Sequence, residues 1–178
     1  MNDPRRTARL AGGLWLIVIA VSIVGVMTQS SAPRVAFAAT QFGGLCYLGV
    51  TVLLYELFKP VDASLSLFAA VCGAAGVASG AAADLVHTDP PIQGFLVSMV
   101  FFGSQIIGIG YLILRSSLVP RALGVLLLLG GASYLINSFT NFLAPTLGAH
   151  VMPFIVPIAI LGEGSLTAWL LVKGVRVS

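Results

Sequence analysis

One carboxylic acid, Glu163, lies in the apolar stretch AILGEGSLTAW, residues 159 to 169, and the nearest other charge is Lys173, ten residues later. This stretch is apolar enough for the centre of a bilayer, where an ionised carboxylate is costly. We therefore expect Glu163 to be mostly protonated at rest. A neutral acid in a dry pocket can donate a hydrogen bond or a proton, as general acids do, so Glu163 is the candidate proton donor.

Other polar residues fall at a similar depth in their own apolar stretches. A helix rises about 1.5 Å per residue, which places Glu163 ~15 Å from Lys173 and near the midplane of a ~30 Å hydrocarbon core. Gln105 lies at the same depth, ten residues from Arg115. Tyr47, Tyr134 and Asn137 fall at ~17–21 Å. The sequence thus predicts a polar layer halfway through the membrane.

The polar residues of one stretch share a helical face. Gly130, Tyr134, Asn137 and Asn141 are spaced i, i+4, i+7 and i+11, which places them on one side of a helix. Unsatisfied polar groups cost several kcal/mol in hydrocarbon, so this face should point into a bundle, as should Glu163.

A second polar layer is expected nearer the outer surface. The members of this second layer are Gln41, Asp84, His87, Asn141 and His150. Together the two layers predict a pocket or pathway from the outer surface to the midplane. Asp84 and His87 have i, i+3 spacing, but no third ligand follows at helical spacing, so neither a metal site nor a cofactor is predicted. The candidate ligand-binding residues are Gln105, Tyr134, Asn137, Asn141, Tyr47 and Asp84.

The composition indicates what kind of elements must position these residues. Of 178 residues, 58% are hydrophobic and 8% are charged, whereas a soluble domain needs about 25% charged residues. A spanning helix takes about 20 mostly apolar residues, and six stretches qualify. They are residues 10–28, 36–58, 63–85, 92–114, 122–143 and 151–172. The expected fold is all-α, a single domain over residues 1–178 that forms an integral membrane bundle of six transmembrane helices.

The charges predict an orientation. Eight of the nine basic residues fall on one side of the expected bundle, and only Arg34 falls on the other. This bias places both termini in the cytoplasm and the protein in a bacterial cytoplasmic membrane. Basic residues at helix ends do not indicate nucleic-acid binding, so the expected partners are membrane lipids and a small apolar ligand. The Gly76/Gly80 face, which allows close helix approach, also makes oligomerisation possible.

Several catalytic signatures are absent from the sequence. It contains no GxSxG, no HExxH, no phosphate-cradling loop and no Asp-rich metal motif. Common serine hydrolases, zinc proteases, nucleotide enzymes and magnesium-dependent prenyl-transfer enzymes are therefore disfavoured. Acid-initiated chemistry on a lipid-like substrate needs none of these motifs.

Nearly the whole chain resembles a family of bacterial multi-pass membrane proteins, domain of unknown function 4386. The likeness is carried by RTARLAGGLWLI, YELFKPVDASLSLFAA, FFGSQIIGIGYLILRSSLVPRALGVLL, SYLINSF and LGEGSLTAWLLVKG. The resemblance implies a six-helix prokaryotic membrane protein and no established activity. In that family histidine is frequent at the position of Gln105 and aspartate at that of Asn137. Neutral amides at both positions disfavour a charge relay with Glu163 and leave hydrogen bonding.

Three classes of function remain open. The protein is a binding protein or enzyme that holds a lipid-like or isoprenoid-like molecule at the polar layer, with Glu163 donating a proton for an isomerisation or cyclisation. Alternatively, it is a transporter or channel in which Glu163 carries the coupling proton. In the third class it is a structural or regulatory subunit, and the polar layer only fixes helix packing.

Overall fold

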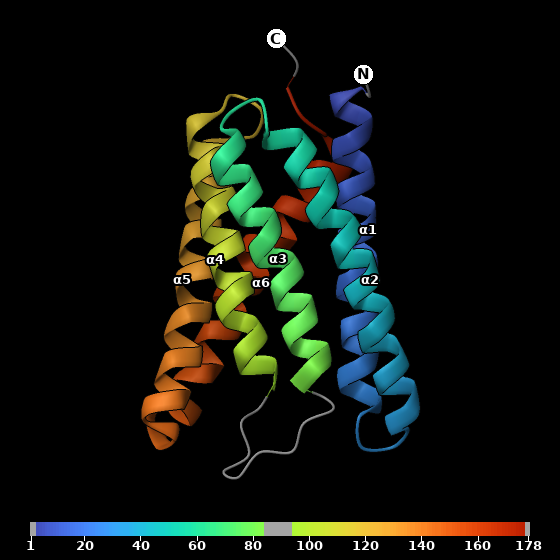
Figure 1. Cartoon of the computed structure of the whole chain (residues 1–178), viewed down its shortest axis with the longest axis vertical. Coiled ribbons are helices and arrows are strands. Elements are labelled where there is room, and N and C mark those ends of the chain that lie inside the picture. Colours follow the sequence, from blue (N-terminus) through green and yellow to red (C-terminus); the bar gives the residue numbers. More distant parts are fainter. Residues whose placement is uncertain (1–2, 84–93, 177–178) are drawn as a thin grey trace.

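The described part of the chain, residues 3–83 and 94–176 of the computed structural model, forms six long α-helices and contains no β-strand (Figure 1). Each helix is long and apolar enough to cross a membrane. This confirms the expected all-α membrane bundle. The helices are α1 (Pro4–Thr28), α2 (Pro33–Phe58), α3 (Ala63–Ala83), α4 (Gly94–Arg115), α5 (Arg121–Leu143) and α6 (Pro145–Val172).

Two helices, α1 and α6, begin more than one turn before their apolar stretches. α1 starts at Pro4 rather than Leu10, where the side chain of Asp3 accepts a hydrogen bond from the Arg5 N–H. α6 starts at Pro145 rather than Val151. Proline is favoured in a first turn because the N–H that it lacks has no helical partner there. The apolar stretch marks the lipid span, whereas the helix continues beyond it. The expected ends at Leu85 and Ile92 lie outside the described residues.

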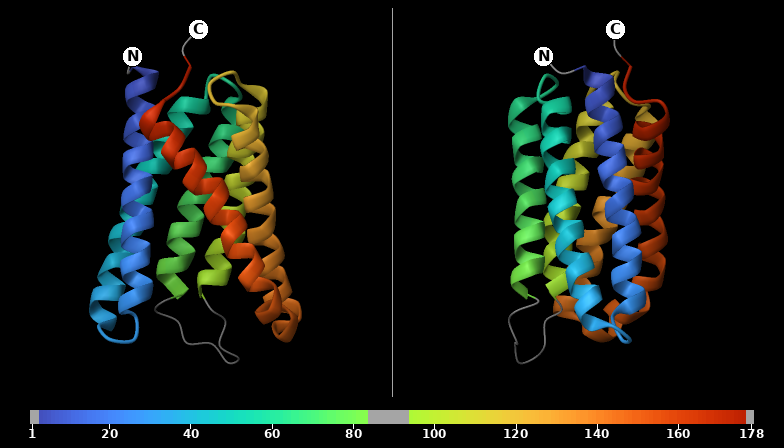
Figure 2. Two further views of the ribbon diagram at one scale, coloured as in Figure 1. Left: turned by 180° about the vertical axis from the view of Figure 1, so that it is seen from behind. Right: turned by 90° about the vertical axis from the view of Figure 1, so that its right-hand side faces the viewer.

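Each helix packs against its neighbours in sequence, and α6 closes the ring by packing against α1. Both termini lie at one end of the bundle, together with the α2–α3 and α4–α5 connections (Figure 1). α6 runs obliquely, near α1 at the terminal end and near the far end of α5 at the other (Figure 2, left). The side of the membrane that the terminal end faces stays a prediction.

Glycines set the close approach of α4 to α5. A Cβ atom added at Gly131 would lie 2.6 Å from the carbonyl oxygen of Gly103, and one at Gly103 would lie 2.9 Å from that of Gly131. Gly110 and Gly124 repeat this reciprocal contact two turns nearer the termini, at 2.8 Å each. Small residues let helix backbones approach within a membrane, where packing drives association.

The Gly76/Gly80 face of α3 packs against α4 of the same chain. A Cβ atom at Gly76 would meet the Phe102 ring at 2.6 Å, and one at Gly80 would lie 3.5 Å from Ser98. The close helix approach expected of this face therefore occurs within the chain. We do not propose an oligomer contact through it, because α4 already covers it.

The main hydrophobic core fills the half of the bundle nearer the termini. It includes Trp15, Phe58 and Leu170, each at most 1% exposed. Its other buried members are Ala8, Ala11, Tyr47, Val50, Leu54, Leu57, Ala69, Ile106, Ile109, Leu112, Ile113, Val119, Leu127, Leu166 and Val175. The midplane residues therefore lie at the outer boundary of this core.

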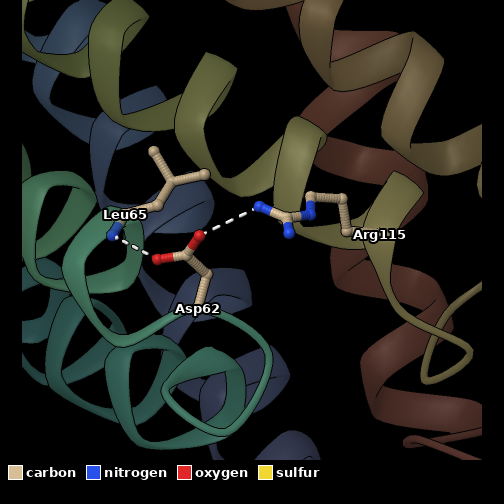
Figure 3. Close-up of polar contacts among 3 residues, drawn as sticks. All are labelled: Asp62, Leu65 and Arg115. Atoms are coloured by element: carbon tan, nitrogen blue, oxygen red, sulfur yellow. Dashed lines mark hydrogen bonds and ion pairs between the residues drawn. The ribbon is translucent and has the colours of Figure 1, made fainter.

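An ion pair joins two connections at the terminal end. The Arg115 Nη1 at the end of α4 lies 3.0 Å from the Asp62 Oδ2 just before α3 (Figure 3). The other carboxylate oxygen of Asp62 accepts a 3.0 Å hydrogen bond from the Leu65 N–H and so caps α3. One side chain thus both starts α3 and holds it to the end of α4.

Candidate functional site

The carboxyl group of Glu163 contacts two other helices. The Tyr134 hydroxyl on α5 donates a 2.5 Å hydrogen bond to Glu163 Oε1 on α6. The indole of Trp15 on α1 lies beside the same carboxyl group. Glu163 and Tyr134 are both half-buried residues, and full burial of the glutamate stays a prediction. The carboxyl group therefore lies toward α5 and α1.

Gln105 is the centre of a separate, fully buried network. Its Oε1 accepts a 2.9 Å hydrogen bond from the Tyr47 hydroxyl, and its Nε2 donates to Thr51 Oγ1 at 3.1 Å. The side chain lies over Gly73, where an added Cβ atom would be 2.5 Å from Nε2. Gln105 is 1% exposed. Because Tyr47 and Thr51 both belong to α2, this one helix supplies hydrogen-bond partners for both the oxygen and the nitrogen of the buried amide. It is not a partner of Glu163.

The two networks meet through aromatic rings. The Trp15 ring lies edge-to-face with Tyr47, with centroids 6.1 Å apart. Tyr47 in turn packs against Phe102 of α4, with centroids 4.9 Å apart. Edge-to-face pairs at such distances are favourable packing contacts. The midplane layer is therefore continuous from α6 through α1 and α2 to α4, although the link is aromatic rather than a chain of hydrogen bonds.

Asn137 and Asn141 pair with one another along α5. The Asn141 Nδ2 donates to the Asn137 carbonyl oxygen at 2.8 Å and to its Oδ1 at 3.2 Å. Asn137 is 1% exposed, and its Nδ2 lies 3.7 Å from Met99 Sδ. These two residues face inward, as their spacing predicted, but neither bonds to Glu163.

The outer polar layer is only partly visible. Asp84 and His87 lie outside the described residues. His150 is exposed, and its Nδ1 lies 2.7 Å from the Thr146 carbonyl oxygen. Gln41 on α2 is partly exposed. Among the described residues, this layer is joined to the midplane layer through the hydrogen bonds of Asn141 to Asn137.

A small cavity adjoins the Gln105 network on its terminal side. Its volume is about 10 Å³, and Thr51, Ser66 and Gln105 supply side-chain polar groups to its wall. The Ser66 hydroxyl donates to the Tyr55 carbonyl oxygen at 3.0 Å. A polar cavity of this size has room for about one water molecule. It is too small for an organic ligand.

Two buried polar atoms on α6 lack a hydrogen-bond partner, Thr167 Oγ1 and Trp169 Nε1. Thr167 lies one turn after Glu163 on α6 and is 2% exposed. Its hydroxyl bonds to none of the residues of the midplane layer. The half of α6 nearer the termini therefore carries polar groups that have no hydrogen-bond partner among the described residues.

The sequence patterns did not single out Trp15, Thr51 and Met99 as partners of the polar layer. Thr51 carried a signal, because it lies one turn after Tyr47 on the same face. Trp15 carried none, since the crossing of α1 and α6 brings it to Glu163. That crossing is close at Gly12, where an added Cβ atom would lie 2.8 Å from the Leu171 nitrogen.

Chemically, the half-buried part of this layer is an acid with a hydroxyl and an indole beside it. Such a group can bind a polar head by hydrogen bonding or charge, or exchange a proton. Among the described residues, no group of three His, Cys, Asp or Glu side chains is placed to hold a metal ion.

Comparison with known proteins places these residues in a wider group. The family profile described as "Domain of unknown function (DUF4386)" matches residues 81–174, a range that contains Gln105, Tyr134 and Glu163. An uncharacterized protein of Archaeoglobus fulgidus is 25% identical over 131 residues, which cover 72% of this chain and 77% of that protein. No solved structure is significantly similar.

Proposed function

Since the chain belongs to the DUF4386 family, whose description gives no activity, we propose a function from its own polar layer. The protein binds a small lipid-like or isoprenoid-like molecule at the membrane midplane, with the carboxyl group of Glu163 as the polar anchor. The apolar part of the ligand lies along the lipid-facing surface, and Tyr134 holds the carboxyl group in place.

The carboxyl group of Glu163, in a half-buried residue of an otherwise apolar helix, carries this proposal. A carboxylate offers about four acceptor positions, and Tyr134 occupies one of them. Acidic residues in membrane spans are rare because they are costly, and they mark functional sites more often than other residues do.

In this proposal Glu163 is also the group that would donate a proton if the bound molecule is transformed. Tyr134 bonds to one oxygen, and the indole of Trp15 also lies beside the carboxyl group. Gln105 and Tyr47 lie in the adjoining enclosed network, and Asn137 and Asn141 lie further along α5. We assign these four residues a supporting role in shaping the site rather than direct contact with the reacting group.

The experiment is mass spectrometry of small molecules that co-purify with the wild-type protein, with Glu163→Gln and with Glu56→Gln. Glu56 is an exposed acid at the end of α2, so its variant controls for the loss of one negative charge. We expect a specific apolar compound in the wild type and the control. Loss of this compound from Glu163→Gln identifies an anchor, and retention of an unprocessed precursor identifies a proton donor.

Two other outcomes favour the remaining classes. A substrate-dependent pH change in proteoliposomes that disappears in Glu163→Gln favours a proton-coupled transporter. If all three proteins carry only bulk lipid and have the same melting temperature, the proposal is wrong and the polar layer is structural.

We further propose that the terminal end of the bundle faces the cytoplasm, because eight of nine basic residues gather there. A carboxy-terminal fusion to green fluorescent protein should fluoresce in bacteria, and a fusion to alkaline phosphatase should be inactive. The opposite pair of results would reverse the orientation.

A further inference from the structure

Three arginines at the start of α1 line a hollow at the terminal end of the bundle. This basic hollow has a volume of about 380 Å³, and its wall is formed by Asp3, Arg5, Arg6, Arg9 and Leu10. All three arginines are exposed, and among the described residues none of them forms an ion pair. The Asp3 carboxylate caps α1 by accepting a hydrogen bond from the Arg5 N–H. The charged side chains that line the hollow therefore leave an excess of positive charge.

The helix holds these like charges close together. Successive residues of a helix are about 100° apart, so Arg9 lies between the directions of Arg5 and Arg6. Like charges spaced by one turn repel each other and destabilise the helix. An anion bound among them relieves this repulsion. Phosphate suits the site in particular, because the planar N–H donors of a guanidinium group bond to two phosphate oxygens at once.

The arginines point away from the interior of the bundle. Thr7 and Ala11 are buried, and they lie on the opposite side of α1 from the three arginines. Arg9 directly precedes Leu10, where the apolar stretch of α1 begins. The basic hollow is therefore placed where the lipid headgroups meet the outer surface of the protein.

An apolar surface continues along α1 directly beyond the arginines. Leu10, Leu16 and Ile17 are 52%, 51% and 41% exposed. Gly13 lies among them, one turn after Arg9, and a Cβ atom added there would meet no atom within 4 Å. The missing side chain leaves room for an acyl chain beside the leucines.

From this arrangement we infer that the start of α1 binds an anionic phospholipid of the leaflet at the terminal end. The lipid phosphate lies among the three arginines, and an acyl chain runs along Leu10, Gly13 and Leu16. Clusters of basic residues at the end of a membrane helix attract anionic lipids in this way. A zwitterionic lipid carries an ammonium group that the arginines repel, and a free phosphate leaves the apolar surface uncovered. The inference does not depend on the proposed role of Glu163.

The test is thermal unfolding of the delipidated full chain in a mild uncharged detergent, because a ligand that binds the folded state raises the unfolding midpoint. The probes are phosphatidylglycerol and phosphatidylcholine with identical acyl chains, and inorganic phosphate. We expect phosphatidylglycerol to raise the midpoint of the wild type at a concentration about tenfold or more below that of phosphatidylcholine. Inorganic phosphate at the same concentration should have no comparable effect.

Two double variants separate a site from a general surface charge. Arg6→Gln/Arg9→Gln should raise the phosphatidylglycerol concentration that is needed by about tenfold or more. Lys59→Gln/Arg121→Gln removes two exposed basic residues from the same end of the bundle and should leave it unchanged. Unfolding without lipid confirms that both variants fold.

Four outcomes overturn the inference. Equal effects of the two phospholipids show that the headgroup charge is not recognised, and an equal effect of inorganic phosphate shows an ion site without a lipid. Equal weakening by both double variants shows a diffuse basic surface. If Glu163→Gln abolishes the response to phosphatidylglycerol, the lipid binds at the midplane instead, whereas an unchanged response keeps the two sites independent.

Discussion

The hydroxyl of Tyr134 on α5 bonds to the carboxyl group of Glu163 on α6 at 2.5 Å, and this contact joins two helices at the membrane midplane. Because both residues are partly exposed, the bond also determines where the carboxyl group sits relative to the lipid. We therefore expect the contact to affect both the stability of the bundle and the retention of the proposed ligand, and these two effects can be measured separately.

Tyr134→Phe should lower stability slightly and disturb ligand retention more strongly. Interhelical hydrogen bonds in membranes contribute about 0.6 kcal/mol on average, and the largest about 1.7 kcal/mol. We expect a modest fall in the thermal unfolding midpoint in detergent and loss of the co-purifying compound. Tyr111→Phe is the control, because the Tyr111 side chain is 47% exposed near the end of α4. Equal retention by both variants would remove Tyr134 from the site.

Gly73→Ala should disrupt the Gln105 network. The new Cβ atom would lie 2.5 Å from Nε2 and 2.6 Å from Oε1, so the amide must move away from Tyr47 and Thr51. Overpacking of this kind costs about 1–3 kcal/mol, which exceeds the ~1 kcal/mol that alanine gains over glycine in a helix. Thermal unfolding should show destabilisation, whereas Gly164→Ala, with no atom near its added Cβ, should be neutral or stabilising.

The direct way to assign this effect to Gln105 is a double-mutant cycle. If the amide is the obstacle, Gly73→Ala should cost much less in a Gln105→Ala background, because the side chain that it meets is gone. Additive effects of the two substitutions would show that Gly73 is needed for some other reason.

Adjacent glycines on α5 should respond very differently to alanine. At Gly131 an added Cβ atom would lie 2.6 Å from a backbone carbonyl of α4, which can retreat only if the helices separate. At Gly130 the nearest atom, Ala159 Cα, would be at 3.5 Å, an ordinary contact. We expect Gly131→Ala to destabilise the protein by about 2 kcal/mol or more and Gly130→Ala to leave its melting temperature nearly unchanged. Similar effects of both would contradict the α4–α5 geometry.

Sequence reasoning located the helices and placed Glu163 and Tyr134 at similar heights along theirs, since both depend on distance along one chain segment. The apolar stretches predicted six helices, and counting from the basic ends brought Glu163 and Tyr134 to the same depth. Lateral neighbours depend on how helices cross, which the sequence does not specify. Thus Gln105 was grouped with Glu163 but bonds to Tyr47 and Thr51, and Trp15 reaches Glu163 because α1 crosses α6 closely at Gly12.

Rotation about a helix axis was the other quantity that the sequence left open. Glu163 was expected to point fully inward because hydrocarbon penalises an exposed charge. The structure leaves it partly exposed, with Tyr134 as its hydrogen-bond partner.

Asp62 has two roles at the terminal end, and two substitutions separate them. Its carboxylate caps α3 through the Leu65 N–H and pairs with Arg115 (Figure 3). Asp62→Ala removes both contacts and should cost about 1 kcal/mol, mostly from the lost cap. Asp62→Asn keeps an oxygen for the cap and loses the ion pair, which is half exposed on the Arg115 side and worth about 0.2–1 kcal/mol.

Thermal unfolding at low and high salt checks this, because salt should remove the difference between wild type and Asp62→Asn and preserve the cost of Asp62→Ala. A salt-independent cost of Asp62→Asn would mean that the cap, rather than the ion pair, requires the charge.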